Sequence, residues 1–305
     1  MNVQARRIAI VIPTFKEHQH VMNLLNDLEK QSYRDFIILV VNSNPDDETS
    51  ELINNYQGKM IVRELKAHPG LYWTGSVNKG LDWIKENEGD ALEYCLFINC
   101  DTRLNSTFIE NYIEAAREKP EAILCSAISR GDRYDSSGVR MRSWMLSVTS
   151  HYLIGSVNSK NKHNRFIPVD MLAGRTLLFP IDALYRVGRP NSEMLPHYGA
   201  DYEFSARAKR IGFPLYVFTD ITAEADTSNT GKKAFQIAST LSKRLRYLFD
   251  IRSPLNIKYR IRFARLTYPK YAVASGIITL IIKSLVEVFL GKTSYILLKR
   301  KHVLD

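Results

Sequence analysis

Short apolar runs alternate with amphipathic segments along the first three quarters of the chain. A continuous run of apolar and β-branched residues predicts a strand, and apolar positions three to four residues apart predict a helix. The predicted strands span residues 7–15, 36–44, 59–65, 94–101, 122–128 and 214–226, with helical patterns between the first five. Because these strands are apolar on both faces, we expect a mainly parallel central sheet flanked by helices, which is an α/β fold.

The region after the fifth strand is less regular. Residues 129–165 show no clear period, and Ser129–Gly138 has the composition of a loop. Residues 170–188 predict a strand and a helix around Pro180, and residues 195–212 predict a loop that enters a helix. The strand and helix pattern therefore resumes after an irregular stretch and continues to residue 226.

Charge divides the chain near residue 240. Residues 241–305 hold fourteen Lys and Arg against three Asp and Glu, whereas residues 1–240 are close to neutral. Such an asymmetry indicates an anionic partner, either a membrane surface or a nucleic acid. We therefore predict two parts, a folded body of residues 1–240 and a basic, amphipathic helical tail of residues 241–305.

The tail also contains an apolar stretch of membrane-like length, AVASGIITLIIKSLVEVFL. Lys283 and Glu287 interrupt this stretch, and its uninterrupted part, residues 272–282, is short for a membrane span. An amphipathic helix in the membrane interface fits better, with packing onto the body and a true span as alternatives. Nucleic acid is disfavoured because no recognisable nucleic-acid-binding fold accompanies the basic residues.

Composition is that of a globular protein, with 45% hydrophobic and 24% charged residues. Cys95, Cys100 and Cys125 are too few for a disulfide framework or a zinc site, and we expect them to pack in the core. The first residues predict a strand and not a signal peptide. A cytoplasmic location is therefore expected.

The predicted strand 94–101 ends on a single carboxylate, Asp101. Sheets of this class bind ligands at the carboxyl ends of their strands. In one interpretation Asp101 is a ligand of Mg²⁺ or Mn²⁺, because such ions keep several waters and one carboxylate suffices when a diphosphate supplies further oxygens. In the other interpretation Asp101 is a turn or capping residue before the next helix.

Two further segments allow two interpretations each. Asp201 and Glu203 open a predicted helix, where they either complement the helix dipole or make Asp201 a general base beside His197 and Tyr198. The glycine-punctuated segment 70–80 is either a loop where backbone approaches a ligand or a tight turn with aromatic core anchors. No glycine-rich loop follows the first strand, which argues against a dinucleotide-binding Rossmann site and a P-loop kinase.

In combination, these segments resemble the family 2 inverting glycosyltransferases, which have a GT-A fold. The resemblance covers about residues 7–226 and rests on motifs in the family's order, namely IVIPTFKE, VVNSNPDDET, YWTGSVNKGL, FINCDTRL, LAGRTLLFP and LPHYGADYEFSARAKRIGF. Within the family the pattern is similar to rhamnosyltransferase-like members that build bacterial surface polysaccharides. The resemblance therefore implies a GT-A type body followed by the helical basic tail.

The resemblance also implies roles for individual residues. Asp201 matches the catalytic base, with Glu203 as a second catalytic acid, and Asp101 matches the metal ligand. The implied nucleotide-sugar-binding residues are Pro13, Thr14, Glu17, Asn42, Gly75, Asn78, Asn99 and Asp101, with Asp47 and Gly80 near them. The implied acceptor-side residues are Gly174, Arg175, His197 and Tyr198. Asn42 and Asn99 stand where the family has aspartate, so we expect altered base recognition and weaker metal binding.

The implied reaction moves a sugar from a nucleotide-diphosphate donor to a hydroxyl of a glycan or lipid-linked acceptor. Asp201 would remove the acceptor proton, and Mg²⁺ or Mn²⁺ on Asp101 would stabilise the departing diphosphate. The alternative is a non-catalytic module that binds a nucleotide sugar or glycan, favoured by Asn42 and Asn99. A nucleotidyltransferase is disfavoured because IPTFKEHQH lacks a glycine-rich basic loop. We expect a peripheral protein on the inner face of the cell membrane, held there by residues 241–305.

Overall fold

The computed structural model describes residues 8–88, 91–135, 138–151, 164–225 and 240–301, with backbone only for Asp135 and residues 290–301. The described strands are β1 (Ile8–Thr14), β2 (Phe36–Asn42), β3 (Ile61–Lys66), β4 (Tyr94–Ile98), β5 (Thr102–Arg103), β6 (Ile123–Arg130), β7 (Arg133–Asp135), β8 (Gly138–Ser143), β9 (Val148–Ser150), β10 (Phe166–Pro168), β11 (Met171–Leu172), β12 (Thr176–Pro180) and β13 (Leu215–Ala225). The helices are α1 (His18–Glu29), α2 (Glu48–Asn54), α3 (Tyr72–Asn87), α4 (Phe108–Glu118), α5 (Ile181–Arg186), α6 (Ala200–Arg210), α8 (Leu241–Arg246), α9 (Ile257–Thr267) and α10 (Val273–Lys301), with short 3₁₀ turns at Pro69–Leu71 and Lys270–Ala272.

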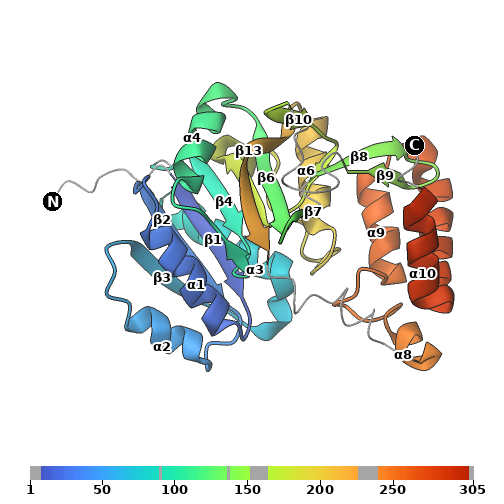
Figure 1. Ribbon diagram of the computed structural model, residues 1–305, viewed down its shortest axis with the longest axis horizontal. Coiled ribbons are helices and arrows are strands. Elements are labelled where there is room, and N and C mark those ends of the chain that lie inside the picture. Colours follow the sequence, from blue (N-terminus) through green and yellow to red (C-terminus); the bar gives the residue numbers. More distant parts are fainter. Residues whose placement is uncertain (1–7, 89–90, 136–137, 152–163, 226–239, 302–305) are drawn as a thin grey trace.

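The central sheet has the order β10-β13-β6-β12-β4-β1-β2-β3 (Figure 1). Its first strands pair in parallel, β1 with β2 and β4, and β2 with β3. β12 is antiparallel to both of its neighbours, β4 and β6, so Thr176 at its start pairs with Ile98 at the end of β4. The residues just before β12 therefore meet the residues just after β4 at one edge of the sheet.

The alternation of side chains along each strand divides the core into two layers. Ile8, Ile10 and Ile12 of β1 belong to the layer that α1 and α4 cover, and Ala9 and Val11 belong to the layer that α3, α5 and α6 cover. Every residue of β1, β2 and β4 is buried, as expected for strands covered on both faces. The predicted mainly parallel sheet flanked by helices is therefore confirmed.

Two local predictions were wrong. Ser129–Gly138 is not a plain loop, because β6 continues to Arg130 and turns back into β7, which pairs with it antiparallel. An edge hairpin of this kind is held by backbone hydrogen bonds, so its polar side chains resemble those of a loop. Gly75 does not lie in a loop either, because α3 begins at Tyr72 and contains both Gly75 and Gly80. A Cβ at position 80 would lie 2.6 Å from Val11 Cγ1, so glycine lets α3 lie directly on β1.

The C-terminal helices pack against the body at one end of the molecule (Figure 1). α9 lies between α6 and α10, and the β8–β9 hairpin reaches across to α10. The Arg210 side chain donates to the Leu266 carbonyl at 3.0 Å, which ties α6 to α9. The predicted boundary at residue 240 stays a prediction, and residues 226–239 lie outside the described part.

Candidate functional site

A cavity of about 400 Å³ opens at the carboxyl ends of β1 and β2, a volume typical of small-molecule sites. Its wall is formed by residues 13–15 and Glu17, by Ser43, by residues of the segment 69–76, by His197 and Tyr198, and by residues of the segment 247–252. The structure thus brings together Pro13, Thr14 and Glu17 with His197 and Tyr198, although the first three were expected on the donor side and the last two on the acceptor side.

Two buried polar atoms of this cavity wall have no hydrogen-bond partner among the described residues. They are Oγ1 of Thr14 and Nδ1 of His197. Buried polar groups are nearly always paired in folded proteins, so an unpaired group in a cavity wall indicates a missing ligand or water. Burial and the charge of Arg252 lower the pKa of His197 to about 4. His197 is therefore neutral at neutral pH and acts there as a hydrogen-bonding group, not as a cation.

Asp101 lies at the edge where β4 and β12 meet. Its carboxylate forms an ion pair with the Arg175 guanidinium, and both side chains are about one sixth exposed. The amide of Asn99 donates to the Arg175 carbonyl at 3.1 Å. The antiparallel position of β12 thus brings the Arg175 guanidinium against Asp101, the acid that follows β4.

Asn99 and Cys100 also contact the cavity wall from the side away from the cavity. Trp73 Nε1 donates to Asn99 Oδ1 at 2.9 Å, and Cys100 Sγ donates to Glu17 Oε2 at 2.8 Å. Trp73 and Glu17 are both part of the cavity wall. Asn99 and Cys100 are therefore connected to the cavity wall through two side chains, and the Asn99 oxygen is already engaged by Trp73.

These residues fit a divalent cation only in company with further ligands. No group of three or more His, Cys, Asp or Glu that could hold a metal ion occurs in the part of the chain that the structure describes. Asp101 offers one carboxylate, shared with Arg175, and Asn99 Oδ1 already accepts from Trp73. Mg²⁺ is often bound by one or two carboxylates together with substrate phosphates, so a diphosphate would have to complete such a site.

Asp201 stands in the first turn of α6, opposite the start of β12. Its Oδ2 accepts from the Gly174 amide at 2.8 Å, and its Oδ1 accepts from the Tyr202 amide at 2.9 Å. Burial raises the pKa of Asp201, while these two amides act in the opposite direction. A carboxylate whose pKa is raised toward neutrality is better suited to accept a proton than an ordinary aspartate.

Gly174 links this carboxylate to the cavity wall. A Cβ at position 174 would lie 2.6 Å from the Trp73 ring and 3.1 Å from Asp201 Cβ. Glycine is therefore required at this point, because the indole and the first turn of α6 approach the backbone from two sides. Asp201, Gly174, Arg175 and Asp101 consequently form one continuous edge behind Trp73, and none of the four is in the cavity wall itself.

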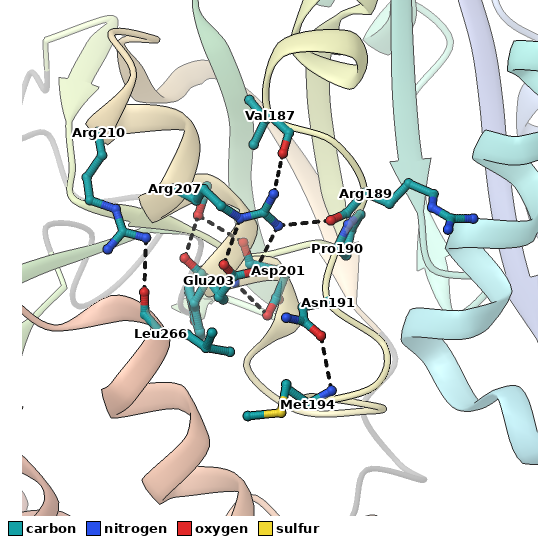
Figure 2. A network of polar contacts seen from close by, with 12 residues as sticks. Val187, Arg189, Pro190, Asn191, Met194, Asp201, Glu203, Arg207, Arg210 and Leu266 are labelled. Atoms are coloured by element: carbon teal, nitrogen blue, oxygen red, sulfur yellow. Dashed lines mark hydrogen bonds and ion pairs between the residues drawn. The ribbon is translucent and has the colours of Figure 1, made fainter.

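Glu203 has different surroundings from Asp201. Its side chain is only 3% exposed and receives two hydrogen bonds from Arg207, from Nε at 2.8 Å and from Nη2 at 3.0 Å. Figure 2 shows Arg207 continuing from Glu203 to the carbonyls of Val187 and Arg189. Glu203 thus fastens the residues after α5 to α6 and is not in the cavity wall. Its role as a second catalytic acid stays a prediction.

Three residues expected at the nucleotide sugar lie behind the cavity wall. Asn42 donates to Glu64 Oε1 at 2.9 Å and accepts from the Asn44 amide at 3.0 Å, which holds the turn after β2. Asn78 donates to the Pro190 carbonyl at 2.9 Å. Gly75 is covered by Leu71. None of the three is in the wall, whereas their neighbours Ser43 and Ser76 are. The expected roles of Asn42, Gly75 and Asn78 at the nucleotide sugar stay predictions.

The tail contributes to the cavity, which none of the sequence motifs indicated. The guanidinium of Arg252 lies 5.1 Å from the centroid of the Phe15 ring and 5.9 Å from that of the Tyr72 ring, the geometry of cation–π contacts. Asp250 Oδ1 accepts from the Arg252 amide at 2.8 Å and fixes the turn. The basic composition of the tail was the available signal, but it did not single out any one arginine.

Comparisons with known proteins agree with this fold. A model of glycosyl transferase family 2 matches residues 9–186. Poly(ribitol-phosphate) beta-N-acetylglucosaminyltransferase TarP of Staphylococcus aureus is 28% identical over 119 residues, which are 37% of this chain and 34% of TarP. TarS, of the same name and species, is 24% identical over 107 residues, which are 34% of this chain and 18% of TarS. The matched parts thus span about a third or less of these relatives.

Solved structures of S. aureus TarS have a similar backbone. One superposes with a TM-score of 0.55 at 14% identity, covering 92% of this chain and 54% of that one. A shorter TarS chain, residues 1–349, in complex with UDP-GlcNAc superposes with a TM-score of 0.52 at 16% identity, covering 90% of this chain and 89% of that one. At such low identity the likeness shows a shared fold.

Proposed function

The chain belongs to glycosyl transferase family 2, and we propose that it moves a sugar from a nucleotide-diphosphate donor to a hydroxyl of a glycan or lipid-linked acceptor, with inversion at the anomeric carbon. The observation that carries the proposal is the position of Asp201. Its half-buried carboxylate, with a raised pKa, lies at the sheet edge that also carries Asp101, next to the wall of a cavity of about 400 Å³.

The chemistry requires one displacement. The acceptor hydroxyl gives its proton to Asp201 while its oxygen forms a bond to the anomeric carbon. The bond from that carbon to the diphosphate breaks, and the diphosphate leaves with the electron pair. No covalent intermediate on the protein is needed. The amides of Gly174 and Tyr202 keep the Asp201 carboxylate oriented for this proton transfer.

We further propose that Asp101 holds Mg²⁺ or Mn²⁺ together with the donor diphosphate. A bound cation supplies charge stabilisation for the leaving group. Arg175, which forms an ion pair with Asp101, can contribute further positive charge near the departing diphosphate.

The names of the relatives suggest the donor and the product class. TarS has been crystallised with UDP and with UDP-GlcNAc, and TarP and TarS are named as N-acetylglucosaminyltransferases acting on poly(ribitol-phosphate). We therefore propose synthesis of a bacterial surface polymer and UDP-GlcNAc as the first donor to test. The rhamnosyltransferase-like assignment stays a prediction, and activated deoxyhexoses are the second set of donors.

We also propose a cytoplasmic protein bound peripherally to the inner face of the cell membrane through residues 241–305. The tail is strongly basic. Among the described residues, one helical stretch, Lys270–Phe289, is long and apolar enough to cross a membrane, and 22% of it is buried in the protein. An interfacial position satisfies both the charge and the apolar surface.

The test of the catalytic proposal is the substitution Asp201→Asn. We expect this variant to lose transfer, measured as product formation, while donor affinity by calorimetry stays near that of the wild type. The control is Asp182→Asn, which removes an exposed carboxylate of α5 and should leave transfer unchanged. Turnover retained in Asp201→Asn would contradict the role of Asp201. A wild type that binds donor but neither transfers nor hydrolyses it would favour the non-catalytic binding module.

A further inference from the structure

The outward face of α10 is apolar along its described length. Ile278, Ile282 and Phe289 are 58%, 54% and 56% exposed. Tyr271, just before the helix, is also exposed, and Ala274 lies between them. Spacings of three, four and seven residues place these side chains on one side of a helix. Side chains of this size are rarely left in water as a contiguous row.

The two charges that interrupt this apolar stretch point inward. Lys283 Nζ donates to the carbonyls of Leu146 and Ser147 at 3.0 and 2.7 Å. Glu287 lies 4.0 Å from the Arg260 guanidinium, which reaches over from α9. No charged side chain is exposed between Tyr271 and Phe289. The sequence suggested a broken apolar segment, whereas the folded chain presents an unbroken apolar face.

The tip of the β8–β9 hairpin extends this face. Met145 and Leu146 are 51% and 60% exposed. The tip is seated on α10, because Thr279 Oγ1 donates to the Met145 carbonyl at 3.3 Å and Lys283 holds the next two carbonyls. Two large apolar side chains from the body thus stand beside α10.

The hairpin tip is held in a strained conformation. Ser147 has φ +47°, a region that L residues rarely adopt. Its hydroxyl donates to the Gly276 carbonyl at 3.2 Å and pairs with the Tyr268 hydroxyl at 3.0 Å. Trp144 packs edge-on against Tyr268. These contacts with α10 and with the segment between α9 and α10 keep Met145 and Leu146 outside.

Charge selects the partner for this face. Lys270 is exposed at its start, and the chain after Phe289 continues with further lysines and an arginine. An apolar face bordered by basic residues matches an anionic lipid surface. A second copy of the chain is a poorer partner, because two tails with fourteen Lys and Arg each would repel one another.

We propose that α10 and the β8–β9 tip form one surface that lies in the headgroup layer of an anionic bilayer, with Met145, Leu146, Ile278 and Ile282 inserted. The inference rests on the membrane association proposed above and names the residues that make it. It also orients the site, since α9 joins α10 to α6, and Phe263 of α9 touches the residue before α6 at Gly199. Asp201 would thus be held at a fixed orientation to the bilayer.

The experiment is flotation of the full-length protein with vesicles of phosphatidylcholine containing phosphatidylglycerol, compared with pure phosphatidylcholine. We expect the wild type to float with the anionic vesicles. The pairs Met145→Glu with Leu146→Glu, and Ile278→Glu with Ile282→Glu, should each weaken partitioning about tenfold or more, because each removes two inserted apolar side chains. The control pair is Met22→Glu with Ile211→Glu, two exposed apolar residues of the body, and it should float like the wild type.

The outcomes separate the inference from the proposals on which it rests. If the hairpin pair floats like the wild type, the shared surface is overturned while association through the tail stands. If the wild type does not float, membrane association fails with it. Transfer to a soluble acceptor tests the catalytic proposal independently and should be unchanged in all pairs. If the glutamate pairs change the molecular mass of the protein in solution but leave flotation unchanged, the face is an interface between copies of the chain. Should a glutamate pair lower the melting temperature, the corresponding serine pair replaces it.

Discussion

Asp101 has two competing partners, the Arg175 guanidinium and the proposed divalent cation. In the absence of a ligand its carboxylate is paired with Arg175, and the neighbouring Asn99 oxygen accepts from Trp73. A divalent cation arriving alone would have to displace the guanidinium and would gain one carboxylate, so its binding should be weak. A diphosphate changes this balance, because it offers oxygens to the cation and charge to Arg175.

Metal binding should therefore depend on nucleotide. We expect titration calorimetry to detect little or no Mn²⁺ binding to the free protein and clear binding once a saturating nucleoside diphosphate, first UDP, is present. Asp101→Asn should abolish the nucleotide-dependent binding. Tight Mn²⁺ binding without nucleotide would contradict the account of the Asp101–Arg175 pair, and nucleotide affinity that is independent of Mn²⁺ would argue against a metal altogether.

Asp201 should give activity and stability opposite pH dependences. Its folded-state pKa is raised above the ordinary value of 3.8, so the folded protein binds its proton more tightly than the unfolded chain does. Ionised Asp201 therefore costs stability, and this cost develops as pH rises from the unfolded-state pKa through the folded-state pKa. We expect Asp201→Asn to be more stable than the wild type at neutral pH, with the difference vanishing in acid.

The measurements are urea unfolding of the two proteins across pH and the pH profile of kcat/KM for the wild type. The acid limb of that profile should lie above 3.8, because the base must be ionised to accept a proton. A stability difference that grows toward low pH would reverse the assigned sign.

At the scale of elements, α6 is fastened to the chain that follows α5 by the Glu203–Arg207 network (Figure 2). Arg207→Met would leave Glu203 buried without its cation, and breaking a buried pair in this way costs about 3–5 kcal/mol. Arg186→Met is the control, because it removes an exposed pair of the same i,i+4 spacing, for which about 1 kcal/mol or less is expected. Urea unfolding at neutral pH measures both.

The double variant Glu203→Gln with Arg207→Met decides what Glu203 does. It removes both charges, so much of the lost stability should return. If Glu203 only fastens the two segments, transfer should return with stability. If stability returns and transfer does not, Glu203 has the catalytic role that the family resemblance implies.

The elements themselves were largely predictable, because their signals are local. Continuous apolar runs located β1, β2, β4 and β6 within a few residues. The position of β12 was not predictable, since a buried antiparallel strand between two parallel strands has the same apolar pattern as a buried parallel strand. That insertion is what places Arg175 on Asp101. The position of the Asn78 side chain was not predictable for a similar reason, because its partner, the Pro190 carbonyl, comes from a distant part of the chain.

At the scale of the whole molecule, the tail is part of the site and not an appendage. The turn after α8 places Tyr247, Asp250 and Arg252 in the same cavity wall as Thr14 and Glu17. The charge pattern predicted that the tail would meet an anion. It could not predict that one of its arginines stacks on Phe15 and Tyr72, since that contact depends on the packing of α9 and α10 against the body.

Arg252 should therefore contribute to binding of the donor's charged part. Its guanidinium is held in place by two rings, and the structure gives it no hydrogen bond or ion pair with the described residues, so it is available to a diphosphate. Arg252→Ala should weaken UDP binding about tenfold or more, the usual contribution of a charge-assisted hydrogen bond, while uridine binding stays unchanged. Arg246→Ala is the control, because Arg246 carries the same charge on α8 outside this cavity wall.

Loss of Arg252 should also raise the pKa of His197 from its present value of about 4, since the guanidinium opposes protonation of the imidazole. Calorimetry and a histidine NMR titration measure the two effects separately. If Arg252→Ala weakens the binding of uridine and of UDP equally, Arg252 shapes the cavity wall without contacting the diphosphate. If the pKa of His197 does not change in this variant, the guanidinium does not lie close enough to the imidazole to affect it.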